Sequence, residues 1–282
     1  MATALKRLLP KRFRKDTLPV PVVRLNGVIM SGGSPLRSSI SLQGVAPLLE
    51  RAFSVKSAPA VAIIVNSPGG SPVQSRLIFQ RIRDLATEKN KHVIVACEDL
   101  AASGGYMIAC AGDEIIADPS SVVGSIGVVS GGFGFVDLIR KIGVERRVHT
   151  AGQNKATLDP FRPERPEDIE HLKALQLDVH GTFIDLVRER RGTKLADHPD
   201  LFTGLFWSGV RGLELGLVDR LGDLRGVVRE RYGPEAKLKI VQPKRGLLSM
   251  RPAGAASRIA SAVGDGILDA AEERALRSRY GL

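Results

Sequence analysis

The stretch VAIIVNSPGG, residues 61–70, contains the pattern from which the fold can be predicted. Its first six residues form a short, continuous apolar run, which is typical of a strand buried on both faces of a sheet. The run ends abruptly in the turn sequence SPGG at 67–70, and apolar residues at helical spacing follow over 72–88. A buried strand that passes through a glycine turn into a helix is the start of a parallel βαβ unit.

The same arrangement recurs further along the chain. HVIVACE at 92–98 has the composition of a buried strand, DLAASGG at 99–105 interrupts it, and 104–111 is expected to form a short helix. This alternation predicts an α/β fold on a largely parallel sheet. The other expected elements are strands at 20–30, 114–117, 122–129 and 145–149, helices at 42–53, 135–142 and 166–191, a helix, turn, strand and helix over 205–232, and a short tail helix at 265–279.

The excess positive charge lies entirely in the two ends of the chain. The 41 Lys and Arg exceed the 30 Asp and Glu by 11; residues 1–15 contribute +6 and residues 237–282 contribute +5. The body is therefore neutral, which argues against a nucleic-acid-binding domain. Basic ends suit a membrane surface, an acidic partner or simple solubility. The expected division is a basic N-terminal segment at 1–18, a folded domain at 19–236 and a basic tail at 237–282.

Composition excludes several other classes. Hydrophobic residues make up 43% of the chain, which is incompatible with disorder throughout. The two cysteines, Cys97 and Cys110, are too few for a disulfide scaffold or a zinc cluster and are expected to be free core thiols. Residues 1–15 lack the apolar run of a secretory signal, and the longest uncharged stretch, 119–136, is rich in Gly and Ser. We expect a cytoplasmic protein, or one peripheral at the inner face of the cell membrane.

Two glycine-rich turns at strand ends are the candidate site. Asn66–Gly70 follows the first buried strand, and Ala102–Tyr106, which contains Ser103, follows the second. In α/β sheets, sites gather at the carboxyl ends of the strands. Exposed backbone N–H groups on such turns can hold a developing oxyanion, and Ser103 would present its hydroxyl beside them. Each turn taken alone is equally an economical way to reverse the chain.

A nucleophilic serine needs a base, and the sequence offers few. GxSxG, GxxxxGK[ST] and HExxH patterns are absent, and the five histidines are scattered, although a Ser-His-Asp triad formed in space stays open. A lysine can serve instead if burial keeps it neutral. Lys155, in AGQNKATLDPF, is isolated from other cations between Arg147 and Arg162; an ordinary solvated loop lysine is the alternative.

Four ordered motifs resemble the signal peptide peptidase A (SppA/SohB-like) family of S49-type serine peptidases. They are NSPGG at 66–70, DLAASGGYMIA at 99–109, ADPSSVVGSIGVV at 117–129 and GLVDRLG at 216–222. The resemblance implies a crotonase/ClpP-like spiral of ββα units with a Ser-Lys dyad. It implies these roles: Ser103 as nucleophile, Lys155 as general base, Ser125 as the serine that orients the lysine, Gly70 and Gly104 as oxyanion-hole donors, and Pro68 and Gly69 as the supporting turn.

The resemblance also implies a reaction and an assembly. A serine endopeptidase of this kind needs neither metal, nucleotide nor other cofactor, and cleaves extended peptides such as signal-peptide remnants or membrane-associated peptides. Single-length members form rings, so a homo-oligomer, a tetramer or octamer, is expected, with the dyad shared between subunits. Many members begin with a transmembrane anchor, whereas this chain has a basic segment there, which puts signal-peptide remnants in doubt as the substrate.

Two other readings stay open. A crotonase-type acyl-CoA enzyme would share the fold and the oxyanion hole but would need a carboxylate, for which Asp99 is the nearest acid to the Ser103 turn. A catalytically degenerate scaffold that organises membrane proteins through its basic ends would need neither Ser103 nor Lys155.

Overall fold

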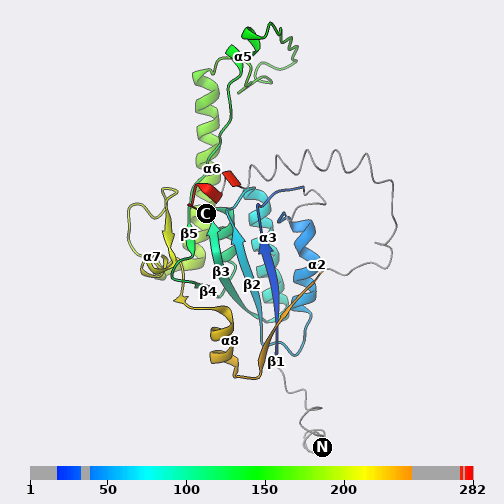
Figure 1. Cartoon of the computed structure of the whole chain (residues 1–282), viewed down its shortest axis with the longest axis vertical. Helices are drawn as coiled ribbons and strands as arrows, with labels where there is room; N and C mark the ends of the chain where they lie inside the picture. The colour runs from blue at the N-terminus through cyan, green and yellow to red at the C-terminus, as the bar shows by residue number, and fades with distance from the viewer. Residues whose placement is uncertain (1–17, 33–38, 243–273, 276, 282) are drawn as a thin grey trace, which may run out of the picture.

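The computed structural model describes residues 18–32, 39–242, 274–275 and 277–281, and its centre is one mixed sheet (Figure 1). The sheet has the order β6-β5-β3-β2-β1-β8, with β4 paired to β3 and β7. All pairings are parallel except that of β5 with β6. The strands are β1 (Leu18–Asn26), β2 (Ala60–Ser67), β3 (His92–Ala102), β4 (Glu114–Ala117), β5 (Val122–Gly124), β6 (Phe206–Ser208), β7 (Arg220–Leu221) and β8 (Ala236–Ile240).

Helices cover both faces of this sheet. They are α2 (Leu42–Phe53), α3 (Pro72–Lys89), α4 (Gly104–Ala109), α5 (Val136–Lys141), α6 (Pro166–Arg191), α7 (Gly209–Glu214) and α8 (Leu224–Tyr232), with a 3-10 turn at Gly192–Lys194. Alternate residues of β2 separate two cores: Val61, Ile63 and Val65 join the larger core with α2, α3, α4 and the end of α6, whereas Ala60 and Ala62 pack with α8. This period of two follows from the pleat of a strand buried on both faces.

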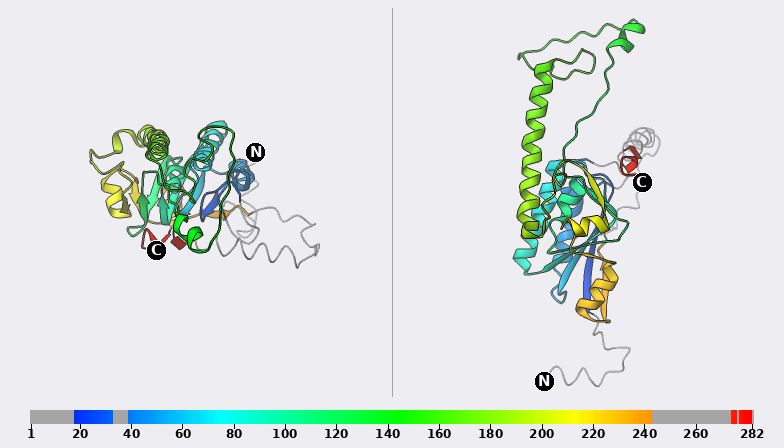
Figure 2. Two further views of the ribbon diagram at one scale, coloured as in Figure 1. Left: turned by 90° about the horizontal axis from the view of Figure 1, so that it is seen from above. Right: turned by 90° about the vertical axis from the view of Figure 1, so that its left-hand side faces the viewer.

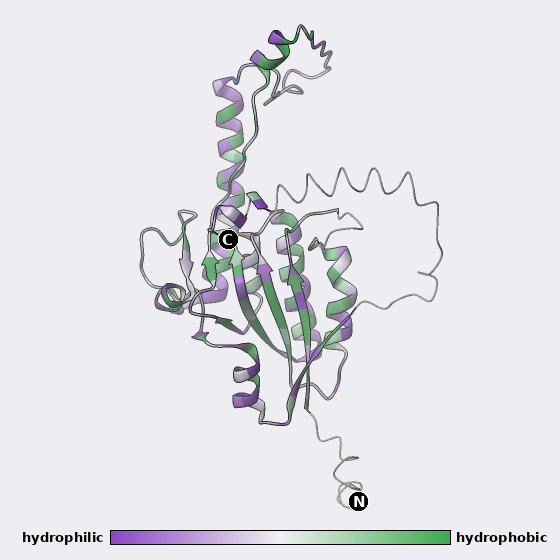
Figure 3. Cartoon of the chain, viewed as in Figure 1, coloured by the Kyte–Doolittle hydropathy of each residue, from purple (hydrophilic) through white to green (hydrophobic). Residues whose placement is uncertain are grey.

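The predicted α/β class, with the crotonase/ClpP-like arrangement that the resemblance implies, is confirmed. Most of the expected elements are also present, and Figure 3 shows long hydrophobic runs along the central strands. The helix at 42–53 has the predicted bounds and begins at the cap Ser41, whose hydroxyl accepts from the N–H of Gly44. The long helix α6 begins at Pro166 with Glu167 and Asp168 in its first turn, as expected for the positive end of a helix dipole.

Several expected elements differ from those observed. The strand expected at 122–129 ends at Gly124, and no strand forms at 145–149, where the chain is exposed and has no neighbouring strand to pair with. Over 205–232 the order is strand, helix, strand, helix, because FWS at 206–208 adds to the edge of the sheet. β8 pairs with β1 and crosses the boundary predicted at 236/237. Of the predicted tail helix, only 274–275 and 277–279 lie among the described residues, and 274–275 and 277–278 are helical.

A long projection leaves the body beyond β5. Residues 129–165, here called the arm, run outward and return at the start of α6, which extends from the body to the arm's outer end (Figure 2). No residue of the arm is buried, including all of α5. The inner end of α6 is anchored, since Phe183 and Val187 are buried in the larger core. Within the described ranges, no helix is long and apolar enough to cross a membrane.

Candidate active site

The register of two neighbouring strands brings Ser103 and Ser125 together. β3 and β5 run parallel, with Ala102 opposite Gly124, and the two serines are the residues that follow. The N–H of Ser103 donates to the carbonyl of Gly124 at 2.8 Å, which fixes one strand end against the other. Both serines are half-buried at the carboxyl edge of the sheet, as predicted for the position of a site.

Ser103 has an unusual backbone conformation. Its φ is 51° and its ψ is −123°, in a region that residues with a side chain rarely adopt. It lies between the last residue of β3 and the first residue of α4, so the strand turns sharply into the helix at this serine. Such strain costs about 1–3 kcal/mol and persists where the surroundings enforce it, often at functional sites. The same strand–turn–helix geometry presents nucleophilic serines in other α/β enzymes.

The Pro-Gly-Gly turn after β2 packs directly on the Ser103 turn. A Cβ at Gly69 would lie 2.8 Å from both the backbone nitrogen of Gly104 and the Cβ of Ser103. A Cβ at Gly70 would lie 2.1 Å from the carbonyl oxygen of Ile29. Both glycines also have positive φ, 100° and 137°, which side-chain-bearing residues avoid. Glycine is therefore required at 69 for the two turns to approach each other, and at 70 for the turn to pass the backbone of Ile29.

The predicted oxyanion-hole donors lie on these two turns. Gly104 is the first residue of α4, so its N–H has no acceptor within the helix. Among the described residues we find no hydrogen-bond acceptor for the N–H of Gly70 or of Gly104. Gly69 instead donates its N–H to the hydroxyl of Ser67 at 3.1 Å. Two unpaired N–H groups on turns that touch beside a serine hydroxyl are the elements of an oxyanion hole.

A groove of about 720 Å³ opens at Ser103. Among the described residues that line it there is no carboxylate, the group that a crotonase-type reaction would need. Asp99 instead accepts a hydrogen bond of 2.7 Å from the side-chain amide of Asn66, which supports a structural role for that carboxylate. The lining comprises Val28, Ile29, Met30, Ser31, Pro68, Gly70, Ser71, Pro72, Ser103, Ser125, Gly127, Val128, Val129, His180, Thr203, Gly204, Arg279 and Tyr280.

One histidine lines this groove, which sequence reasoning did not predict. His180 lies on α6, and its Nε2 is 3.0 Å from the carbonyl oxygen of Ile126. Because a carbonyl can only accept, Nε2 carries the proton and donates it to Ile126. The bond ties α6 to the segment that follows Ser125. No local motif marks His180, since its position depends on the packing of α6 against residues distant in sequence.

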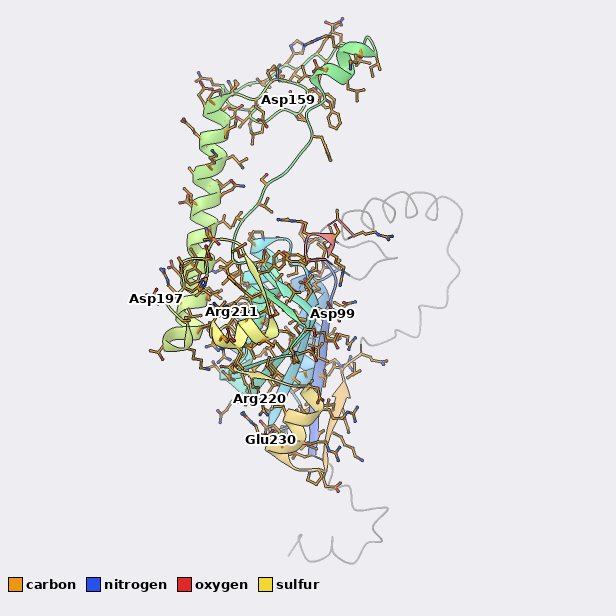
Figure 4. All side chains as sticks on the ribbon, turned by 60° about the vertical axis from the view of Figure 1, so that its left-hand side comes forward. Asp99, Asp159, Asp197, Arg211, Arg220 and Glu230 are labelled. Atoms are coloured by element: carbon orange, nitrogen blue, oxygen red, sulfur yellow. The ribbon has the colours of Figure 1, made fainter. Side chains whose placement is uncertain are left out.

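Lys155 is not part of the groove within one chain. It is exposed in a turn of the arm, where its N–H donates to the carbonyl of Gly152 at 3.3 Å. Figure 4 labels Asp159, four residues further on, at the outer end of the arm, far from Asp99 in the sheet. The structure therefore brings together Ser103, Ser125, Gly70, Gly104, Pro68 and Gly69, and it leaves Lys155 apart from them.

The C-terminal segment reaches the groove from the other end of the chain. The hydroxyl of Tyr280 lies 3.2 Å from the Oγ of Ser125, and its ring packs edge-on against Phe206 with 4.9 Å between centroids. Arg279 and Tyr280 both line the groove. This contact joins residues that lie far apart in the sequence.

The two cysteines lie in the core and not in the groove. Cys97 and Cys110 are free and buried, as predicted. Burial raises the pKa of each thiol to about 12, so neither is a thiolate at neutral pH. Neither cysteine is therefore an alternative nucleophile.

Comparison with known proteins gives a family-level result. The sequence profile of Peptidase family S49 matches residues 86–239, which is more than half of the chain and includes Ser103, Ser125 and Lys155. Protease 4 of Haemophilus influenzae is 32% identical over 228 residues, covering 79% of this chain and 36% of that protein. The probable protease SohB of Buchnera aphidicola is 38% identical over 134 residues, covering 48% of this chain and 43% of that protein.

A third relative has a name of a different kind. The Na(+)/H(+) antiporter NhaA of Brucella abortus is 62% identical over 286 residues, which cover 99% of this chain and 39% of that protein. The chain thus spans about two-fifths of the length of this relative, whose name describes the whole protein.

Proposed function

This chain belongs to peptidase family S49, and from that membership we propose that it is a serine endopeptidase with a Ser103–Lys155 dyad. The observation that carries the proposal is the pair of touching turns: a strained serine at the end of β3 beside two N–H groups that have no acceptor in the described part of the chain. Its proposed substrates are peptides in extended conformation, bound by main-chain hydrogen bonds at the carboxyl edge of the sheet.

The proposed reaction uses groups of the protein alone. Neutral Lys155 accepts the proton of the Ser103 hydroxyl as its oxygen attacks the peptide carbonyl. The N–H groups of Gly70 and Gly104 donate to the oxyanion of the tetrahedral intermediate. The lysine ammonium then protonates the leaving amine, and water, deprotonated by the same lysine, hydrolyses the acyl-enzyme. Ser125 accepts a hydrogen bond from the lysine and orients it.

We propose that the dyad forms between two copies of this chain. Lys155 lies at the exposed arm, outside the groove of its own chain. The arm also exposes large apolar side chains, which mark a surface that another protein covers. They include Val129, Phe133, Leu138, Ile142 and Val144, which are 52–82% exposed. A neighbouring copy that covers this arm would receive Lys155 beside its Ser125, so a closed ring, a tetramer or octamer, would complete every site.

The first experiment tests the nucleophile and the base. A fluorophosphonate probe is expected to label wild type at Ser103 and to leave Ser103→Ala and Lys155→Ala unlabelled. Labelling that persists in Lys155→Ala would refute the lysine assignment, and loss of labelling in His180→Gln but not in Lys155→Ala would transfer the role to the histidine. The exposed Lys173→Ala, on α6, is the matched lysine control and should label like wild type.

The second experiment tests whether the dyad is shared. Ser103→Ala and Lys155→Ala chains are unfolded, mixed in equal amounts and reassembled. If each site combines a serine from one copy with a lysine from the next, random assembly restores about a quarter of wild-type activity. A dyad within one chain predicts no recovery at all, because no chain in the mixture carries both groups.

The two alternative functions, a scaffold and an acyl-CoA enzyme, predict different results. A scaffold without catalysis predicts no probe labelling of the assembled protein, and an acyl-CoA enzyme predicts binding of CoA thioesters. None of the described residues that line the groove is a carboxylate, so the described lining does not favour the acyl-CoA enzyme.

Peripheral contact with a membrane is a separate proposal that rests on charge. Residues 1–17 and 243–273, which hold much of the basic ends, lie outside the described residues. In the described part, exposed Arg225, Arg229, Lys237 and Lys239 lie on α8 and β8, and the start of β1 at Leu18 pairs with Ala236 beside them. The N-terminal basic segment therefore joins the body next to a basic surface, which suits anionic headgroups. Co-sedimentation with phosphatidylglycerol vesicles, lost in a variant with all four residues changed to Ser, tests this; equal binding by that variant would contradict a contribution from the body.

A further inference from the structure

His180 connects the long helix α6 to one wall of the groove. Its Nε2 donates to the carbonyl oxygen of Ile126 at 3.0 Å, and the side chain of Ile126 is fully buried. On the same helix, Phe183 follows His180 and is buried in the larger core. The hydrogen bond therefore joins the chain just beyond Ser125 to a part of α6 that the core holds in place.

The segment that His180 holds has unpaired main-chain groups. Residues 126–129, here called the groove wall, belong to no strand or helix. The N–H of Ser125 donates to the carbonyl of Leu205 at 2.8 Å, which fixes the chain up to this serine. Beyond Ile126, the backbone of 127–129 makes no hydrogen bond with any residue that the structure describes. Such N–H and C=O groups beside a groove are available to pair with an added peptide.

Packing supports the groove wall on one side more than on the other. A Cβ at Gly127 would lie 2.9 Å from the Cα of Gly204, so two main chains lie close together there. Toward α6, Val128, Leu177 and His180 line a hollow of about 250 Å³. Because side chains do not fill the space between Val128 and the helix, the wall depends on the hydrogen bond from His180 for its connection to α6.

We propose that His180 is a positioning residue for the substrate: its bond to Ile126 holds the groove wall so that the backbone of 127–129 pairs with an extended peptide. This inference deepens the proposed function and rests on it for the identity of the substrate as a peptide; the connection between His180 and the wall rests on the contact alone. Without that connection, binding of the peptide would also have to order the wall. Affinity for the peptide should then fall, while the chemistry at Ser103 is unaffected.

This role requires a donor and not a base. Nε2 carries a proton both in the neutral tautomer that is bonded to Ile126 and in the imidazolium, so the bond needs no change of charge. A general base must accept a proton, which Nε2 cannot do while it donates to the carbonyl. A glutamine side chain places its NH₂ group near the position of Nε2, whereas the shorter asparagine does not reach it. His180→Gln should therefore keep the bond, and His180→Asn should lose it.

The first test compares peptide hydrolysis with fluorophosphonate labelling in the full-length protein. The substrate is a short, internally quenched peptide of alanine and leucine, which suits the apolar side chains of Val28, Ile29 and Met30 in the groove. His180→Asn should raise KM at least about tenfold and change kcat less than about threefold, and His180→Gln should restore KM to within about twofold of wild type. Labelling of Ser103 should keep the wild-type rate in both variants.

The control for this test is His171→Ala, which removes an exposed histidine from the same helix and should behave as wild type. Equal KM values in His180→Gln and His180→Asn would overturn the proposal. So would a loss of kcat and of labelling with KM unchanged, because that pattern belongs to a group that acts in the chemical step.

The second test measures peptide binding without catalysis. A fluorescein-labelled, end-capped peptide of the same composition is titrated into full-length Ser103→Ala, and its anisotropy gives Kd. Adding His180→Asn should weaken binding at least about fivefold, and adding His180→Gln less than about twofold. The same Kd in both double variants, or no binding by Ser103→Ala, would refute the role of His180. If binding follows the prediction but wild type neither labels nor hydrolyses peptides, the positioning role stands and the proposed peptidase chemistry fails.

Discussion

The carboxyl edge of the sheet and the arm carry the two halves of the proposed dyad and are built in opposite ways. At the edge, Ser103 is held in a strained conformation by buried strands and by a glycine turn in contact with it. In the arm, no residue is buried and α5 makes no core of its own. The proposed nucleophile is thus positioned by the fold of one chain, whereas the proposed base lies on a segment that this fold leaves exposed.

The largest effect should come from the serine at the edge. Ser103→Ala should reduce peptide hydrolysis by at least about 10³-fold, because the nucleophile is lost while the oxyanion donors remain. The melting temperature should stay close to that of wild type, since the hydroxyl is half-exposed. Ser130→Ala, in the arm, is the matched control and should retain full activity. Residual hydrolysis above a few per cent in Ser103→Ala would mean that another group attacks.

Alanine substitutions at two glycines with positive φ, one at the edge of the sheet and one in the arm, compare how tightly the two regions are packed. Gly69→Ala should lower the free energy of unfolding by about 3 kcal/mol, because its Cβ would meet the backbone of Gly104 and the Cβ of Ser103 at 2.8 Å. Gly152→Ala, in the arm with φ 106°, meets only the flexible Cγ of Lys155 at 3.2 Å and should cost about 1 kcal/mol or less. Urea denaturation of the two variants measures both. Similar costs would mean that the arm is as tightly packed as the edge.

The anchored end of α6 should respond to pH. Arg191, itself buried, donates two hydrogen bonds to Asp219 at 2.9 and 3.0 Å. Burial alone would raise the pKa of Asp219, but hydrogen bonds from Arg191, Lys194 and the N–H of Ile115 outweigh it, so the pKa is lowered. The ionised Asp219 therefore stabilises the folded chain fully at pH values above its unfolded-state pKa. This stabilisation is lost as the pH falls through its folded-state pKa.

The corresponding variant removes the charge of Asp219 while preserving its shape. Asp219→Asn should cost about 3 kcal/mol at pH 7 because Arg191 is left buried without its anion. Its stability should also fall less steeply than that of wild type between pH 5 and pH 3. Asp137→Asn, whose partner Arg140 is an exposed neighbour in the arm, should change neither quantity measurably. Parallel pH profiles for wild type and Asp219→Asn would refute the linkage.

The smallest effect on folding should come from the apolar tip of the arm. Phe133 is 82% exposed, so Phe133→Ser should leave the unfolding transition of the isolated chain unchanged. Its effect should appear in assembly, as a shift toward smaller species in sedimentation velocity. A clear loss of thermal stability without a change in assembly would mean that the arm packs against its own body.

The sequence predicts the edge far better than the arm. The runs 61–66 and 92–98 are apolar without interruption and end in glycine turns, so strands, turns and the positions of Ser103 and Gly70 follow from local rules. The strand predicted at 145–149 does not form: the segment ERRVH has one apolar residue, Val148, to bury, and no neighbouring strand pairs with it. His180 and Tyr280 reach the groove only through contacts over long sequence separations, which no local pattern encodes.

The length of α6, 26 residues, sets the spacing in any assembly that is built on the arm. At 1.5 Å per residue the helix is about 39 Å long, and it sets how far from its own groove each chain presents its lysine. Inserting seven residues in the exposed half of α6 would lengthen the helix by about 10 Å and keep the faces of its two halves nearly aligned. Inserting two residues would turn its outer end through about 200°. The distance between neighbouring sites, and their rotation relative to one another, would then depend on the length of one helix.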